Sequence, residues 1–398
     1  MNKLLPVLGA LIIAVILCWA RPVLSHETVT TTVLFDREIV RILNSHCVMC
    51  HIDEGPAFPL VTYEQVWLQK RKISAAVIAR HMPPWAAFSG YGRFANENVI
   101  TLRESQFIVS WMEGLGPRNA GTVFTNTADP NAPRPQIVRA HADFGSWKVG
   151  RPDVIRELDA IVVAPQESGP VQDDVRRTVI DLGLTAPGAV RALEYMPGDR
   201  RVVRAAFFTV QETGQWIGSW TPWYGFVKLP QATVYRLPAG AHVVAEVHYQ
   251  HLKERVIDRG RLGLFFENRP ASRTVTDVVI EARGEVPGGA TAQRFHALTT
   301  MAADTAVLAL RPELQPGIRS LEVSARRPDG GTDVLLFAKD IALSWPTPYI
   351  YADPVVLRGG TVLAVTAYYA NAGKSPAPAG IRIIVSSYRT TTGTRPRK

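Results

Sequence analysis

The sequence predicts a multidomain protein of the α plus all-β class: a small N-terminal helical domain followed by two β-sandwich or jelly-roll domains. Apolar residues recur at helical spacing between residues 35 and 114, whereas short runs alternate between apolar and polar residues from residue 147 onward. The chain has 398 residues, which is more than a single domain usually holds. These two patterns of apolar residues therefore predict an α-helical part and a larger β part.

The first 25 residues have the pattern of a secretory signal peptide. Lys3 supplies a positive charge, the run from Leu8 to Trp19 is apolar, and Val23 and Ser25 precede a suitable cleavage site. The apolar run is shorter than the roughly 20 residues that a membrane-spanning helix needs. We therefore expect cleavage after Ser25 or Ala20, a periplasmic protein and no stable membrane span afterwards. An uncleaved membrane anchor is the alternative.

The charge of the chain is moderately basic. The formal net charge is +9, and removal of Lys3 and Arg21 with the signal peptide leaves +7. No basic run is interleaved with aromatic residues, so we expect no nucleic-acid partner. A basic surface favours an acidic protein partner.

Residues 47–51 read Cys-Val-Met-Cys-His, which is the attachment motif of a c-type haem. Cys47 and Cys50 would each bond to a haem vinyl group, and His51 would bind the iron as proximal ligand. A redox dithiol is the first alternative, and export argues against it. A zinc half-site is the second, but the chain has no second cysteine pair. The motif therefore predicts one covalent haem c.

Three helices are expected around this motif. Two of them begin with a capping-box pattern, Thr62 with Gln65 and Thr101 with Glu104, and Gly114 ends the last one. The apolar positions that define their inner faces are Phe35, Ile39, Ile42, Leu43, Val66, Ile73, Val77, Phe107, Ile108 and Trp111. Three helices around one haem predict a small class I cytochrome c domain.

Met82 is the expected distal ligand of the haem iron. It follows the second helix, and the two prolines after it stiffen the loop. A thioether ligand raises the reduction potential, which suits electron transfer. The alternatives are His81, Met112 on the last helix, and an open coordination position.

Two further roles are predicted for residues near the haem. Trp85 is expected to cover the haem edge, because it closes the loop that carries Met82. Pro56 or Pro59 is expected to offer its carbonyl to the second ring nitrogen of His51 and so to fix the imidazole.

The remainder of the chain is predicted to be a linker followed by strands. Residues 119–146 are rich in Pro, Asn, Ala and Thr and lack periodicity. Alternating runs then recur, punctuated by Gly, Pro and Asp. These predicted strands are residues 176–182, 190–196, 201–210, 241–250, 261–266, 274–282, 305–314, 319–330, 333–340, 361–370 and 381–388.

The mature chain resembles bacterial exported proteins that join a cytochrome c to a copper type II, ascorbate-dependent monooxygenase-like module. That module is similar to peptidylglycine hydroxylating monooxygenase. The helical half carries the resemblance through "CVMCH", "FPLVTYEQV" and "HMPPW". The β half carries it through "WKVGRPDV", "MPGDRRVV", "LPAGAHVVAEVHYQ" and "RLGLFF".

The resemblance implies two copper sites, but most of their ligands are replaced in this chain. The family's His-His pair is here Arg204 and Ala205, and its His-Tyr-His strand keeps only His248, since Gln250 takes the last position. Its Pro-His-Met-His motif is here residues 312–315, with Glu313 and Gln315 at the two His positions.

No methionine follows Met301 to act as the family's late ligand. We therefore expect no bound copper, and we interpret His248 as a weak remnant of a copper site. Arg204 on a buried strand would need an acidic partner, for which we predict Glu313.

These observations predict an exported mono-haem c-type cytochrome that transfers electrons to or from a redox partner protein. Its β module, a degenerate copper-monooxygenase-like unit, would serve as a scaffold or docking surface. A copper- and haem-dependent monooxygenase and a haem-based sensor or accessory protein are the alternatives. The predicted divisions are a signal peptide (1–25), a cytochrome c domain (26–118), a linker (119–146) and two β-sandwich domains (147–272 and 273–398).

Overall fold

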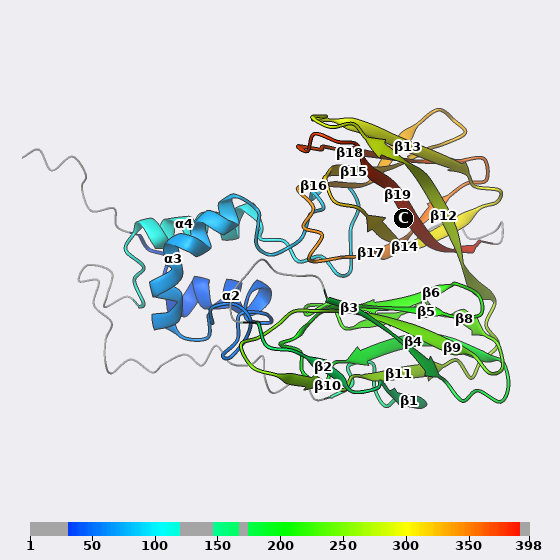
Figure 1. Ribbon diagram of the computed structural model, residues 1–398, viewed down its shortest axis with the longest axis horizontal. Helices are drawn as coiled ribbons and strands as arrows, with labels where there is room; N and C mark the ends of the chain where they lie inside the picture. The colour runs from blue at the N-terminus through cyan, green and yellow to red at the C-terminus, as the bar shows by residue number, and fades with distance from the viewer. Residues whose placement is uncertain (1–30, 120–145, 167–173, 391–398) are drawn as a thin grey trace, which may run out of the picture.

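The computed structural model describes residues 31–119, 146–166 and 174–390. The predicted signal peptide and nearly all of the predicted linker lie outside these ranges. Within them, nineteen strands and a few helices form two β-sandwiches, with the helices to one side (Figure 1).

The helices lie close to where their apolar patterns predicted them. They are the π-helix η1 (Phe35–Ile39), α2 (Val40–His46), α3 (Tyr63–Ile78) and α4 (Leu102–Glu113). Both predicted capping boxes are present, at Thr62 and at Thr101, because each threonine side chain accepts the backbone N–H three residues later. Buried side chains from all three α-helices share one small apolar cluster, which includes Leu43, Val66 and Trp111.

The predicted fold class was wrong in its first part. The described chain is mostly β, and no class I cytochrome c domain is evident in its short helical segment. Helical periodicity reveals single helices but not how they pack. Here the chain leaves the helices after α3 and packs on the distant second sandwich before it returns to form α4.

This excursion spans residues 79–101 and contains two buried aromatic residues. Trp85 and Phe94 pack against Tyr349, with ring centroids 5.3 and 5.4 Å away. Phe94 also forms an isolated bridge with Tyr351. A part of the chain that lies between two helices therefore belongs, by packing, to the core of the second sandwich.

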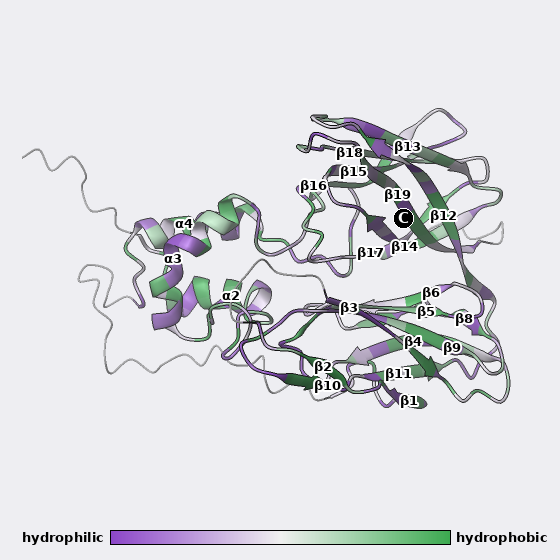
Figure 2. Ribbon diagram, in the orientation of Figure 1, coloured by the Kyte–Doolittle hydropathy of each residue, from purple (hydrophilic) through white to green (hydrophobic). Residues whose placement is uncertain are grey.

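The first sandwich pairs the sheet β3-β9-β5-β6 with the β1-β11-β4 part of a nine-stranded sheet. Its core holds Phe208 of β5, Leu193 of β4 and Leu264 of β11. Figure 2 shows hydrophobic residues along its inner strands. The strands are β1 (Val154–Glu157), β2 (Ile161–Val163), β3 (Asp174–Asp181), β4 (Gly188–Met196), β5 (Val203–Val210), β6 (Trp216–Trp220), β7 (Phe226–Lys228), β8 (Thr233–Leu237), β9 (His242–Tyr249), β10 (Val256–Asp258) and β11 (Arg261–Phe266).

The second sandwich pairs the sheet β13-β18-β15-β16 with the β12-β19-β14-β17 part of the same nine-stranded sheet. Leu321 of β15, Val365 of β18 and Ile383 of β19 meet in its core. Its strands are β12 (Arg273–Val286), β13 (Gln293–Thr300), β14 (Thr305–Leu314), β15 (Ile318–Arg326), β16 (Thr332–Lys339), β17 (Tyr349–Leu357), β18 (Val362–Tyr369) and β19 (Ala377–Arg389).

The two sandwiches are joined by a short parallel pairing of β8 with β12, in which Arg273 lies opposite Thr233. Strand β5 is buried over nearly its whole length. Since a sandwich core covers only one face of a strand, the other face of β5 must be covered by other parts of the chain. No helix in the described ranges is both long enough and apolar enough to cross a membrane.

Candidate functional site

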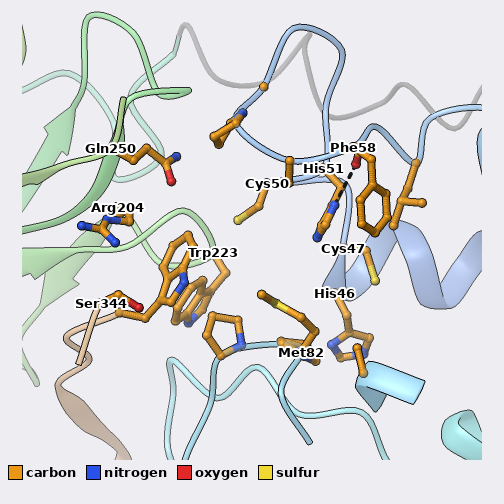
Figure 3. Close-up of a pocket in the computed structure, with 18 of the residues that line it drawn as sticks. His46, Cys47, Cys50, His51, Phe58, Met82, Arg204, Trp223, Gln250 and Ser344 are labelled. Carbon is orange, nitrogen blue, oxygen red and sulfur yellow. Dashed lines mark hydrogen bonds between the residues drawn. The ribbon is translucent and has the colours of Figure 1, made fainter. Parts of the chain in front are cut away.

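A cavity of about 870 Å³ lies between the helical segment and the β-sandwiches, within the size range of small-molecule and cofactor sites. Cys47, Cys50, His51 and Met82 line it from the helical segment. Figure 3 shows these four side chains on one side, with Arg204, Trp223, Gln250 and Ser344 of the β-sandwiches across from them.

Both cysteines are free thiols held in the cavity wall. Cys47 caps the C-terminal end of α2, where its N–H donates to the carbonyl of Leu43, and the chain then turns to bring Cys50 beside it. Burial raises the pKa of both thiols to about 12. Redox-active dithiols usually have a lowered thiol pKa, which is the opposite direction.

His51 is oriented for metal binding through one nitrogen. Its Nδ1 lies 2.9 Å from the carbonyl oxygen of Phe58, to which it donates, so Nε2 is left as the lone-pair nitrogen. Burial lowers the pKa of the imidazole and favours its neutral form. A backbone carbonyl was expected here from Pro56 or Pro59; that prediction was wrong, because the acceptor is Phe58, between them.

Met82 and His81, the two neighbouring candidates for the distal iron ligand, line different cavities. Met82 lines the same cavity as His51, and Figure 3 shows its side chain across the cavity from the imidazole. His81 instead lines a second cavity, between the sandwiches. Met112 lies on α4 and is not among the residues that line the first cavity.

Trp85 does not cover this cavity, contrary to the prediction. It is 4% exposed and packs in the second sandwich, because the excursion that carries it leaves the helices. Trp223 and Trp345 line the cavity in its place, with ring centroids 6.3 Å apart. Trp223 donates from Nε1 to the carbonyl of Asn96, 3.0 Å away. Nothing in the local sequence around Trp223 indicated this role.

His46 was missed by the sequence interpretation, although it lines the cavity. Its Nδ1 lies 2.8 Å from Oδ1 of Asn98, and its Nε2 lies 3.3 Å from Oε1 of Glu104. Since both ring nitrogens are engaged, His46 connects α2 to α4 and is not free to bind a metal ion.

The residues present fit a haem. Two adjacent thiols, an imidazole with a free Nε2 and a thioether across from it surround a cavity whose walls include apolar side chains such as Ile73, Val77 and Leu252. Iron in a haem needs at most two protein ligands, and imidazole with thioether is a known pair. No group of three or more His, Cys, Asp or Glu side chains in the described ranges is placed to hold a metal ion by itself.

The positions that the resemblance assigns to copper ligands do not all face one cavity. Gln250 and Arg204 line the first cavity, whereas His248 lines the second, of about 730 Å³. Nε2 of His248 lies 3.3 Å from Oε1 of Glu246, and its ring meets Phe207 edge-on. His248 and Gln250 face different cavities because β9 ends at Tyr249, so Gln250 no longer follows the alternation of side chains along the strand.

The predicted pairing of Arg204 with Glu313 was also wrong. Glu313 pairs with Arg382 at 2.6 Å and lies 3.7 Å from Arg311 in the second cavity. Arg204 is 1% exposed and donates from Nη2 to the carbonyl oxygen of Tyr249, 3.1 Å away. Glu246, which the sequence interpretation missed, is a carboxylate that joins the sandwiches, since it lies on β9 of the first and contacts Arg311 on β14 of the second.

No protein-family model matches the chain, and no curated protein matches it. Among solved structures, the chain is similar to the major capsid protein P2 of bacteriophage PM2, with 9% identity over 59% of this chain and all of that one, at a TM-score of 0.26. A triple jelly-roll protein of an archaeal virus has 10% identity over 56% of this chain and 60% of its own, at a TM-score of 0.20.

Proposed function

We propose that the protein is an exported mono-haem electron-transfer protein. Cys47 and Cys50 would hold one haem c through thioethers, and His51 and Met82 would supply the two protein ligands of its iron. The single observation that supports this proposal is that Met82, which lies outside the Cys-x-x-Cys-His motif, lines the same cavity as Cys47, Cys50 and His51.

The chemistry of the site follows from its ligands. A bound haem exchanges one electron with a partner, and the protein's own residues set how easily it does so. Met82 stabilises the reduced iron, whereas the hydrogen bond from His51 to Phe58 makes the imidazole a better donor. Because the chain is basic, we propose an acidic periplasmic redox protein as the partner.

The β-sandwiches would then act as scaffold and cavity wall. The copper-monooxygenase alternative needs preformed ligand sets, but Arg204, Gln250 and His248 lie in two different cavities. We therefore propose no copper chemistry for this chain. A sensor needs an exchangeable iron ligand, and the position of Met82 favours a fixed one.

The alkaline pyridine spectrum of the purified protein tests this proposal. Haem bonded to two cysteines has no free vinyl group, so its absorption lies at shorter wavelength than that of free haem. We expect Cys47→Ser and Cys50→Ser each to shift the band to longer wavelength, and the double variant to release its haem into organic solvent. His46→Gln is the matched control and should keep the parental spectrum. A parental spectrum without haem would contradict the proposal.

A further inference from the structure

The first sandwich reaches the haem-attachment loop through the half-buried cation of Arg200. Nη2 of Arg200 donates to the carbonyl oxygen of Met49 at 3.3 Å and to that of Pro222 at 3.0 Å. Met49 lies inside the Cys-x-x-Cys-His motif, while Pro222 follows β6. A single guanidinium group therefore connects the attachment loop to the β module.

A second cation of the same module faces the cavity itself. Arg204 lies on β5, is 1% exposed, and lines the cavity together with Cys50 and Gln250. Figure 3 shows it across the cavity from Cys50. Arg204 lies at an irregularity of β5, between the paired residues Val203 and Ala205, and its Nη2 donates to the carbonyl oxygen of Tyr249 at 3.1 Å, which holds the guanidinium group in place.

Both groups are guanidinium cations, and arginine generally resists deprotonation in proteins. A fixed charge that is shielded from bulk water acts more strongly on a neighbouring site than a fully exposed charge does.

We propose that Arg200, which positions the attachment loop, and Arg204, which lines the cavity, together raise the reduction potential of the haem. This inference rests on the proposed function. An oxidised haem carries one more positive charge than a reduced haem, so nearby fixed cations disfavour oxidation. The β module would thereby tune the haem, not merely support it.

The midpoint potential of the full-length holoprotein, measured by spectroelectrochemical titration, tests the inference. We expect Arg200→Gln to shift the equilibrium at least tenfold toward the oxidised form, about 59 mV for one electron. Arg200→Lys keeps the charge and should keep the potential, which a purely structural role would not predict. Arg326→Gln, at an exposed position on β15, is the control and should leave the potential unchanged.

Arg204→Gln is the second variant and should also lower the reduction potential. It tests the inference independently if Arg200→Gln does not fold. Equal potentials in the parent and both Gln variants would overturn the inference, as would an equal fall in Arg200→Lys and Arg200→Gln. The visible spectrum of the unaltered protein is recorded first. Lack of haem there contradicts the proposed function, whereas a haem-bearing protein with insensitive variants contradicts this inference alone.

Discussion

Glu246 is predicted to be the acid-sensitive link between the two β-sandwiches. It lies on β9 of the first sandwich, and its Oε1 is 3.2 Å from Nη2 of Arg311 on β14 of the second. Its other contacts are His248 at 3.3 Å and Arg177 at 2.7 Å. Removal of this carboxylate would leave the buried Arg311 without its closest acidic group.

The magnitude follows from the pKa of Glu246. The hydrogen bond with His248 and the contacts with Arg177 and Arg311 lower this pKa from 4.5 to about 2. One pKa unit corresponds to about 1.36 kcal/mol, so the ionised carboxylate stabilises the folded state by at most about 3 kcal/mol. Because the folded-state pKa is depressed, this stability is present above pH 4.5 and is lost as the pH falls toward 2.

The assay is chemical denaturation of Glu246→Gln and of the parent at several pH values. We expect the variant to be less stable by about 2–3 kcal/mol at pH 7, with the difference shrinking between pH 4.5 and 2. Glu212→Gln is the control, because Glu212 forms an exposed pair with His242. A Glu246→Gln variant as stable as this control at pH 7, or a difference that does not change with pH, would refute the reasoning.

Three further predictions follow from the site and the cores. Met82→Ala should abolish the weak near-infrared sulfur-to-iron band of the oxidised protein and lower its potential, while Met112→Ala keeps the band; the reverse result would make Met112 the ligand. Trp111→Ala should cost about 3–5 kcal/mol in unfolding free energy, because Trp111 is 2% exposed in the helical core, whereas Leu102→Ala at a 78% exposed position should change it little. Protein given excess copper and then desalted should retain less than one copper per chain by elemental analysis, and two tightly held coppers would restore the monooxygenase alternative.

Local elements were predictable from the sequence because their signals are local. The capping boxes at Thr62 and Thr101, and the buried faces around Val66 and Trp111, follow from residues within a few positions of each other. The alternating runs likewise became strands such as β5, β9 and β14. The π-helical start at Phe35 carries no comparable pattern.

Long-range packing was not predictable in the same way. Trp85 was assigned to the haem edge because it follows Met82 in the chain, but it packs with Tyr349, more than 250 residues away. Trp223 and Trp345 take its place from two different parts of the β region. Their role depends on how the modules dock, and no short pattern encodes that.

In the candidate site, too, the local motif was predictable from the sequence, whereas contacts between distant residues were not. Cys47, Cys50 and His51 form one continuous motif, and Met82 was chosen for its position after a helix; all four line one cavity. The partners of buried charges were not predictable. Arg204 and Glu313 are opposite in charge, yet they lie on strands of different sandwiches and line different cavities.

The central claim is tested most directly by the intact mass of the exported protein. The protein is purified from the periplasm, and its mass is measured under denaturing conditions. Denaturation removes any haem that is held only by coordination or packing, so only thioether-bonded haem remains. The account predicts a mass equal to the mature peptide plus one haem, and the peptide mass alone for a variant with both Cys47 and Cys50 changed to serine. A parental mass that matches the bare peptide would contradict it.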